Sequence, residues 1–194
     1  MSRRMIAALA GAIVIAGCSI VPTAPVLTLY DLGPPPTASA VSMPAPLRIA
    51  DVDAPPSLEG AQMLYRLQYA DPYQHAAYRD SRWAAPPATL VGQRMRQAAA
   101  LGDAALTAPA PLRMVHVELD RFEQVFSAPG TSRVVVQLRA RVLDAATRTR
   151  GSAERSFSVE RDAPSADAAG AARAMAGAVD EVTRQVLGWA AALP

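Results

Sequence analysis

The amino-acid sequence predicts an α+β fold: a mostly antiparallel sheet with two helices packed on one face, preceded by a signal peptide and a proline-rich linker. Two observations support this prediction. Short runs in which apolar and polar residues alternate, as in strands, come in two groups, and a segment with helical spacing follows each group. Turn residues separate neighbouring runs, so most strands are expected to pair with the next one in antiparallel fashion.

The N-terminal stretch has the parts of a secretory signal. Arg3 and Arg4 precede an uncharged run, residues 5–16, and small residues follow. Twelve residues form about 18 Å of helix, which is too short to cross a hydrocarbon core of about 30 Å. The order of basic residues, short apolar run and small-residue cleavage site is typical of a cleaved signal peptide.

Cys18 is the single cysteine of the chain and closes the stretch Ile15-Ala16-Gly17-Cys18. This stretch resembles the bacterial lipobox, in which the thiol receives a diacylglyceryl group and cleavage follows on its amino side. We therefore expect a covalent lipid on Cys18, with acyl chains such as palmitate. The alternatives are a buried thiol, an uncleaved anchor and a twin-arginine signal, of which only the arginine pair is present.

The expected division of the chain follows from this cleavage. Residues 1–17 form the signal peptide, residues 18–25 the lipidated linker and residues 26–194 the folded domain. The formal charge of +2 falls close to zero once the two signal-peptide arginines are removed, so charge gives no argument for a nucleic-acid partner. An acylated Cys18 leaves no free thiol for catalysis, a disulfide or a metal.

The first half of the domain is expected to contain four strands, over residues 26–32, 47–52, 63–69 and 73–79. The first strand, rich in β-branched and apolar residues, is expected at an edge of the sheet. Asp71-Pro72 is a turn signal that joins the last two strands into a hairpin. Pro86-Pro87 leads into a helix that is expected to end near Gly102.

The second half is expected to form a three-stranded antiparallel meander, over residues 114–120, 134–142 and 153–160. Pro129-Gly130 is a strong turn signal between the first two of these strands. A long helix over about residues 167–193 follows, because apolar residues recur there with a period of 3.6: Met175, Val179, Val182 and Val186.

No catalytic or metal-binding motif is recognisable in the sequence. His75 and His116 are far apart, and neither lies at metal-ligand spacing from another candidate ligand. Asp51 and Asp53 share a strand face, but nothing nearby supplies the apolar pocket that would separate their pKa values. The glycine and serine motifs of hydrolases and nucleotide-binding proteins are missing. We expect no enzymatic activity and no cofactor apart from the covalent lipid.

Aromatic and arginine residues gather in the predicted hairpin and just after it. Five aromatic residues lie within nineteen positions, from Tyr65 to Trp83. Tyr, Trp and Arg dominate the energetics of protein interfaces. We predict as partner-binding residues Tyr65, Arg66, Tyr69, Tyr73, Arg82 and Trp83. The alternative is that these side chains cover the seam between the domain's own helices and sheet. Because they fall on both faces of the hairpin, some of them are expected to be exposed.

The lipobox and three further stretches, Tyr30-Asp31-Leu32, Leu64-Tyr65-Arg66 and Ser81-Arg82-Trp83-Ala84 before a proline and a helix, occur in this order. Together they resemble the ABC-type transport auxiliary lipoproteins, a group that includes the paraquat-inducible protein C type, over about residues 27–193.

The resemblance implies an accessory protein of lipid transport across a Gram-negative envelope. Such a lipoprotein would be anchored in the outer membrane, face the periplasm and dock on a transporter subunit with mammalian-cell-entry (MCE) domains, with a ring of copies as one arrangement. Ser19 favours the outer membrane, since an aspartate after the cysteine is associated with inner-membrane retention. The alternatives are a lipid-binding carrier that shields an acyl chain beside the Met175 stripe, and a purely structural envelope lipoprotein.

Overall fold

The structure is a computed structural model that describes residues 26–36, 47–103, 113–144 and 153–193. The predicted signal peptide, the lipidation site Cys18 and the linker lie outside the described residues. The described strands are β1 (Thr28–Tyr30), β2 (Leu47–Asp53), β3 (Gln62–Leu67), β4 (Ala76–Trp83), β5 (Arg113–Ala128), β6 (Thr131–Asp144) and β7 (Ala153–Asp162). The helices are α1 (Pro87–Asp103), α2 (Ala168–Ala191) and a short 3₁₀ turn, Pro56–Leu58.

These strands form one sheet with the order β1-β4-β3-β5-β6-β7. The two longest pairings, β5 with β6 and β6 with β7, are antiparallel, and so is the β3–β4 hairpin. β1 lies at the edge of the sheet, parallel to β4, as expected for the first strand. The predicted α+β fold class and the mostly antiparallel sheet are therefore confirmed.

The long strand β5 joins the two halves of the sheet. β2 pairs in parallel with its first part, from Arg113 to Glu118, and β3 pairs in parallel with its last part, from Gln124 to Phe126. The sequence predicted a shorter strand that ended at Asp120. β5 continues because a register shift between Leu119 and Arg121 re-aims the side chains and lets pairing with β6 go on.

Three predicted boundaries in the hairpin are also wrong. β3 ends at Leu67, so Tyr69 lies in the turn, and β4 begins at Ala76 instead of Tyr73. β4 also runs on to Trp83, which places Arg82 and Trp83 in a strand and not in the approach to α1. The parallel pairing of β1 with residues 81–83 explains this extension, since it provides β4 with a second neighbour.

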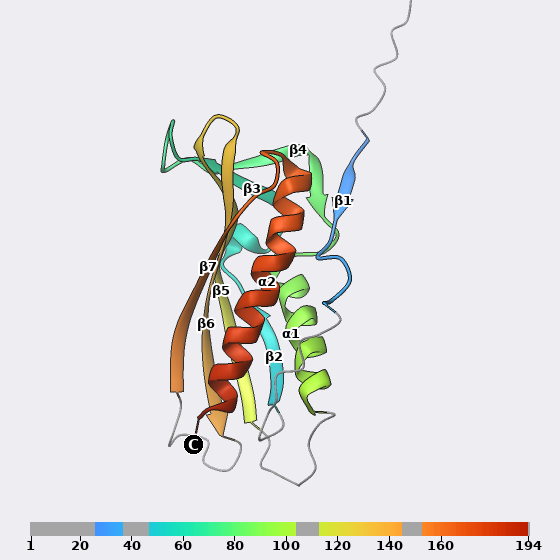
Figure 1. Ribbon diagram of the computed structural model, residues 1–194, viewed down its shortest axis with the longest axis vertical. Helices are drawn as coiled ribbons and strands as arrows, with labels where there is room; N and C mark the ends of the chain where they lie inside the picture. The colour runs from blue at the N-terminus through green and yellow to red at the C-terminus, as the bar shows by residue number, and fades with distance from the viewer. Residues whose placement is uncertain (1–25, 37–46, 104–112, 145–152, 194) are drawn as a thin grey trace, which may run out of the picture.

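The two helices cover one face of the sheet (Figure 1). α1 packs on β2, and α2 packs on β6, β7 and α1. The predicted stripe of α2 is confirmed as core: the side chains of Met175, Val179, Val182 and Val186 are buried and belong to the main hydrophobic cluster. No helix among the described residues is long and apolar enough to span a membrane.

Candidate docking site at the β3–β4 hairpin

The tip of the β3–β4 hairpin projects at one end of the sheet, beside the turn that joins β5 and β6 (Figure 1). The amides of Ala70 and Asp71 both donate to the carbonyl oxygen of Leu67 at 2.9 Å, and the amide of Tyr73 donates to Oδ1 of Asp71 at 2.8 Å. This turn presents two aromatic rings to solvent, because Tyr69 is 47% exposed and Tyr73 is 92% exposed.

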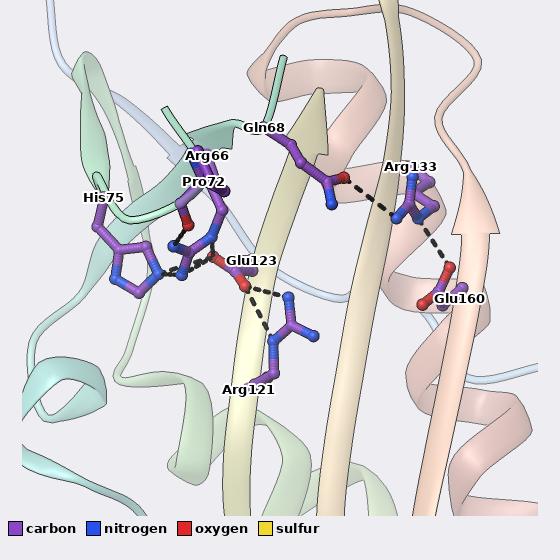
Figure 2. A network of polar contacts seen from close by, with 8 residues as sticks. All are labelled: Arg66, Gln68, Pro72, His75, Arg121, Glu123, Arg133 and Glu160. Carbon is purple, nitrogen blue, oxygen red and sulfur yellow. Dashed lines mark hydrogen bonds and ion pairs between the residues drawn. The ribbon is translucent and has the colours of Figure 1, made fainter. Parts of the chain in front are cut away.

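A buried carboxylate, that of Glu123 in β5, lies beneath the tip (Figure 2). Its side chain is 4% exposed and is surrounded by three basic groups. Nε of Arg66 donates to Oε2 at 3.3 Å, Nε2 of His75 lies 3.0 Å from the same oxygen, and Nε of Arg121 donates to Oε1 at 2.9 Å. A buried carboxylate is tolerated only when it is paired in this way.

Arg66 connects this carboxylate to the tip itself. Its Nη1 donates to the carbonyl oxygen of Pro72, and its Nη2 contacts Nε2 of His75. Both partners lie in the connection between β3 and β4. One guanidinium of β3 therefore contacts both the connection between the two strands of the hairpin and strand β5, and these contacts hold the backbone of the turn.

A second polar contact ties the hairpin to the far strands of the sheet (Figure 2). Nη2 of Arg133 in β6 donates to Oε1 of Gln68 at 3.4 Å, and Nε of Arg133 lies 2.7 Å from a carboxylate oxygen of Glu160 in β7. These groups are partly exposed, so we expect them to stabilise the arrangement only modestly.

Aromatic packing supports the hairpin from inside. The ring of Tyr65 lies 4.9 Å from that of Tyr78 and 5.9 Å from that of Phe126, measured between centroids. The Tyr78 hydroxyl donates to Oε1 of Gln124 at 2.6 Å, and Nε2 of Gln124 donates to Oγ of Ser132 at 2.7 Å. Burial is the main reason that the pKa of Tyr78 rises to about 12, and Asp167 and Tyr65 add to the rise.

The six predicted partner-binding residues differ in how far the structure exposes them to solvent. Tyr69 and Tyr73 project into solvent, whereas Tyr65 and Arg66 are half-buried and support them. Arg82 folds back along its own strand, where Nη1 donates to the carbonyl oxygens of Tyr78 and Ser81.

Trp83 differs from the exposed tyrosines because its side chain is buried, and a contact role for this residue stays a prediction. Its side chain is 3% exposed, and its ring packs edge-to-face on Phe122 with 5.3 Å between centroids. The burial of Trp83 favours the alternative interpretation for this residue, that it covers the seam between the domain's own helices and sheet.

Glu123 and Gln124 were not identified from the sequence. Both are buried polar residues inside the run Phe122, Glu123, Gln124, Val125, all four of which are buried. An alternating pattern cannot predict four consecutive buried residues, because it assumes that the register stays constant past Leu119. The signal available in the sequence was a pair of polar residues flanked on both sides by large apolar ones.

The polar groups of this site hold structure together and are not arranged as a metal centre. Among the described residues no group of three or more His, Cys, Asp or Glu side chains is placed to hold a metal ion. Glu123 already accepts from two guanidinium groups and faces an imidazole, so its carboxylate fixes the hairpin. Such a rigid surface with exposed aromatic rings is suited to binding another macromolecule.

The fold is also found in solved structures. A crystal structure of a Xanthomonas campestris protein, described by the family model DUF330, superposes with a TM-score of 0.64 at 23% identity and covers 84% of this chain and 90% of its own. A second crystal structure, of a protein described as uncharacterized, has a TM-score of 0.64 at 14% identity and covers 84% and 97% of the two chains. At these identities the likeness shows the fold alone.

The family of the protein follows from a match of its sequence to a family model. Residues 29–187 match the family model of the ABC-type transport auxiliary lipoprotein component, and the chain belongs to this family. No curated protein is significantly similar to the chain. The protein is therefore an auxiliary lipoprotein component of an ABC-type transport system, as the resemblance seen in the sequence implied.

Proposed function

We propose that this protein is a non-enzymatic, lipid-anchored adaptor of an MCE-type ABC system for lipid transport. The lipid on Cys18 holds it in the outer membrane, the domain faces the periplasm, and the β3–β4 hairpin docks on the periplasmic MCE subunit. The observation that carries the proposal is the family match over residues 29–187, which begins shortly after a lipobox in the same chain.

The geometry of the hairpin supports a docking role. Tyr69 and Tyr73 are large, exposed residues of the same turn, and the contacts of Arg66 with Glu123 and Pro72 fix the turn before a partner arrives. A preorganised surface loses less conformational entropy on binding, which favours affinity. Tyrosine rings also contribute much contact area for few rotatable bonds.

The anchor and the linker agree with this placement. Two or more acyl chains, each CH₂ contributing about 0.8 kcal/mol, hold a protein at a membrane with great stability. The proline-containing segment after Cys18 spans about 20 Å if it is extended at about 3.1 Å per residue. The domain can therefore stand away from the membrane surface while it remains attached.

The carrier alternative receives no comparable support. It requires room for an acyl chain between α2 and the sheet, beside the stripe from Met175 to Val186. The structure packs this stripe into the hydrophobic core against β6 and β7.

The test is capture of the transporter subunit by purified lipoprotein from envelopes of the source organism, with bound proteins identified by mass spectrometry. We expect the wild-type protein to recover an MCE-domain subunit and the double variant Tyr69→Ala/Tyr73→Ala to recover at least about tenfold less, since two interface tyrosines are lost. Leu29→Ala, which also truncates an exposed apolar side chain, is the matched control and should behave as wild type.

Two outcomes would count against the proposal in different ways. Undiminished recovery of the MCE subunit by the double variant would exclude the hairpin as the docking site. Failure of the wild-type protein to recover any MCE subunit would contradict the adaptor function itself.

A further inference from the structure

Three large apolar side chains at the start of the described chain face solvent. Val26 is 82% exposed, Leu29 is 61% exposed and Leu27 is 51% exposed. Among the described residues only three other large hydrophobic side chains are exposed, and two of them are the hairpin tyrosines. Val26, Leu27 and Leu29 together form a surface, called the N-terminal apolar patch, that the fold does not bury. Exposed apolar patches mark sites of contact with a protein or with a membrane.

The segment that carries this patch is fixed on the domain. β1 pairs with β4, and the amide of Ala84 donates to the carbonyl oxygen of Tyr30 at 2.7 Å. Leu32 is buried in the hydrophobic core, and Nη2 of Arg94 donates to the carbonyl oxygens of Leu32 and Gly33. The backbone that follows the patch is held in place, so a surface that binds the patch also orients the whole domain.

The patch follows closely after the predicted lipid anchor. Val26 is eight positions after Cys18, and that stretch spans at most about 29 Å when it is fully extended. Acyl chains on Cys18 therefore keep the patch within this distance of the bilayer, which gives the membrane surface a high effective concentration. Apolar side chains at that distance are stabilised when they leave water for the boundary between head groups and acyl chains.

The residue types of the patch favour a membrane over a protein as its partner. Hot spots of protein interfaces are enriched in Trp, Tyr and Arg, whereas Leu and Val are under-represented there. The hairpin tip exposes Tyr69 and Tyr73, while the N-terminal apolar patch consists of Val and Leu side chains. The two surfaces therefore suit different partners.

The charged groups beside the patch have both signs. Leu29 lies opposite Arg82 in the register of β1 with β4, and it lines an open groove together with Asp31 and Arg173. Because neither sign dominates, attraction to an anionic surface is weak, and burial of the apolar side chains has to provide the affinity. A contact of this kind does not weaken when salt is added.

We propose that the N-terminal apolar patch inserts into the surface of the bilayer that holds the lipid of Cys18. Val26, Leu27 and Leu29 then form a second membrane contact, which orients the domain, and the linker reaches the membrane without being fully extended. This inference rests on the lipid anchor of the proposed function. Docking at the hairpin uses none of these three residues, so Leu29→Ala remains a control for docking.

The experiment places the full-length lipoprotein on the outside of vesicles made from an equal mixture of phosphatidylethanolamine and phosphatidylglycerol. An acylated Cys18 has no free thiol, so Leu27→Cys provides a single site for an environment-sensitive nitrobenzoxadiazole dye. Lipids with a spin label near the head group should quench at least about half of the fluorescence at position 27. The quenching should persist in about 0.5 M salt, because it depends on apolar contact.

Two further proteins show whether the patch itself is responsible. Leu101→Cys is the matched control, because Leu101 is 53% exposed but lies in the last turn of α1. Figure 1 shows that this end of α1 points toward the end of the domain away from β1. The dye at position 101 should be quenched at least about fivefold less than at position 27. In Leu29→Cys, the added changes Val26→Ser/Leu27→Ser should lower quenching at least about threefold and leave folding intact, since both side chains are exposed.

The possible failures are distinguishable. Mass spectrometry of the N-terminal peptide shows whether Cys18 carries acyl chains, and their absence would overturn the proposed anchor together with this inference. With the lipid present, equal quenching at positions 27 and 101 would overturn the membrane contact alone. Self-quenching of the dye at position 27 that grows with the ratio of protein to lipid, without quenching by the spin label, would overturn it too, because a second copy would then cover the patch.

Discussion

At the scale of single residues, Glu123 determines how rigidly the hairpin is held. Its buried carboxylate faces Arg66, Arg121 and His75, so its loss leaves basic groups without their acceptor. We predict that Glu123→Gln lowers the free energy of unfolding by about 1–3 kcal/mol, measured by urea denaturation. Asp80→Asn is the matched control, because that carboxylate pairs with Arg79 at the exposed surface and its loss should destabilise the domain much less. Equal effects of the two variants would contradict a special role for Glu123.

Truncation is predicted to destabilise the domain strongly at Trp83 and hardly at all at Tyr73. Trp83→Ala removes a buried ring that packs on Phe122 and should lower the free energy of unfolding by about 3–5 kcal/mol. Tyr73→Ala removes an exposed ring and should leave stability within about 0.5 kcal/mol of wild type. Thermal unfolding of both variants, followed by circular dichroism, checks the pair. A stable Trp83→Ala domain would restore this residue as a candidate contact.

Tyr78 is predicted to make folding less favourable at high pH. Its pKa is about 12 in the folded protein, against about 10 for an unfolded chain. Between these values the unfolded state has released the proton and the folded state still holds it, so stability falls as pH rises from 10 toward 12. We expect a loss of about 1–2 kcal/mol, reduced from the full shift because the ring is half-exposed. Denaturation at pH 9 and pH 11 should show this loss in wild type, and a smaller one in Tyr78→Phe.

At the scale of elements, helix α2 offers a test of close packing through two of its glycines. A Cβ at Gly188 would meet nothing within 4 Å, whereas a Cβ at Gly170 would collide with the backbone carbonyl of Ser165. We predict that Gly188→Ala raises the free energy of unfolding by about 0.5–1 kcal/mol, through helix propensity. Gly170→Ala should lower it, because the backbone of the preceding turn cannot move aside without loss of the Asp167 cap. Chemical denaturation of both variants checks the signs, and a gain for Gly170→Ala would contradict this packing.

The elements that could be predicted from the sequence are those whose periodicity is long and regular. The α2 stripe, the alternating residues of β6 and the edge strand β1 all appear where their patterns indicated. The pairing of β3 with the end of β5 could not be predicted, because parallel partners far apart in sequence leave no local pattern. The environment of Glu123 depends on that pairing and on the register shift in β5, so the sequence showed the aromatic residues of the site but not the carboxylate beneath them.

At the scale of the whole molecule, the first described strand, β1, lies next to the hairpin that is proposed to dock, because its neighbour in the sheet is β4. β1, the first described strand after the predicted anchor, pairs with the end of β4 through Thr28 and Ser81. In Figure 1 this strand and the hairpin lie toward the same end of the domain, and the C-terminal end of α2 lies at the other. Under the proposed function, a partner that contacts the hairpin therefore approaches the end from which the lipidated linker leaves.

The most direct test of the docking proposal is site-specific photocrosslinking in living cells. A photoreactive phenylalanine analogue replaces Tyr73 at the hairpin tip, or Glu154 near the opposite end of the sheet as the control. We predict an adduct with the MCE-domain subunit from position 73 and none from position 154. An adduct of equal yield from both positions, or no adduct with that subunit from position 73, would contradict docking through the hairpin.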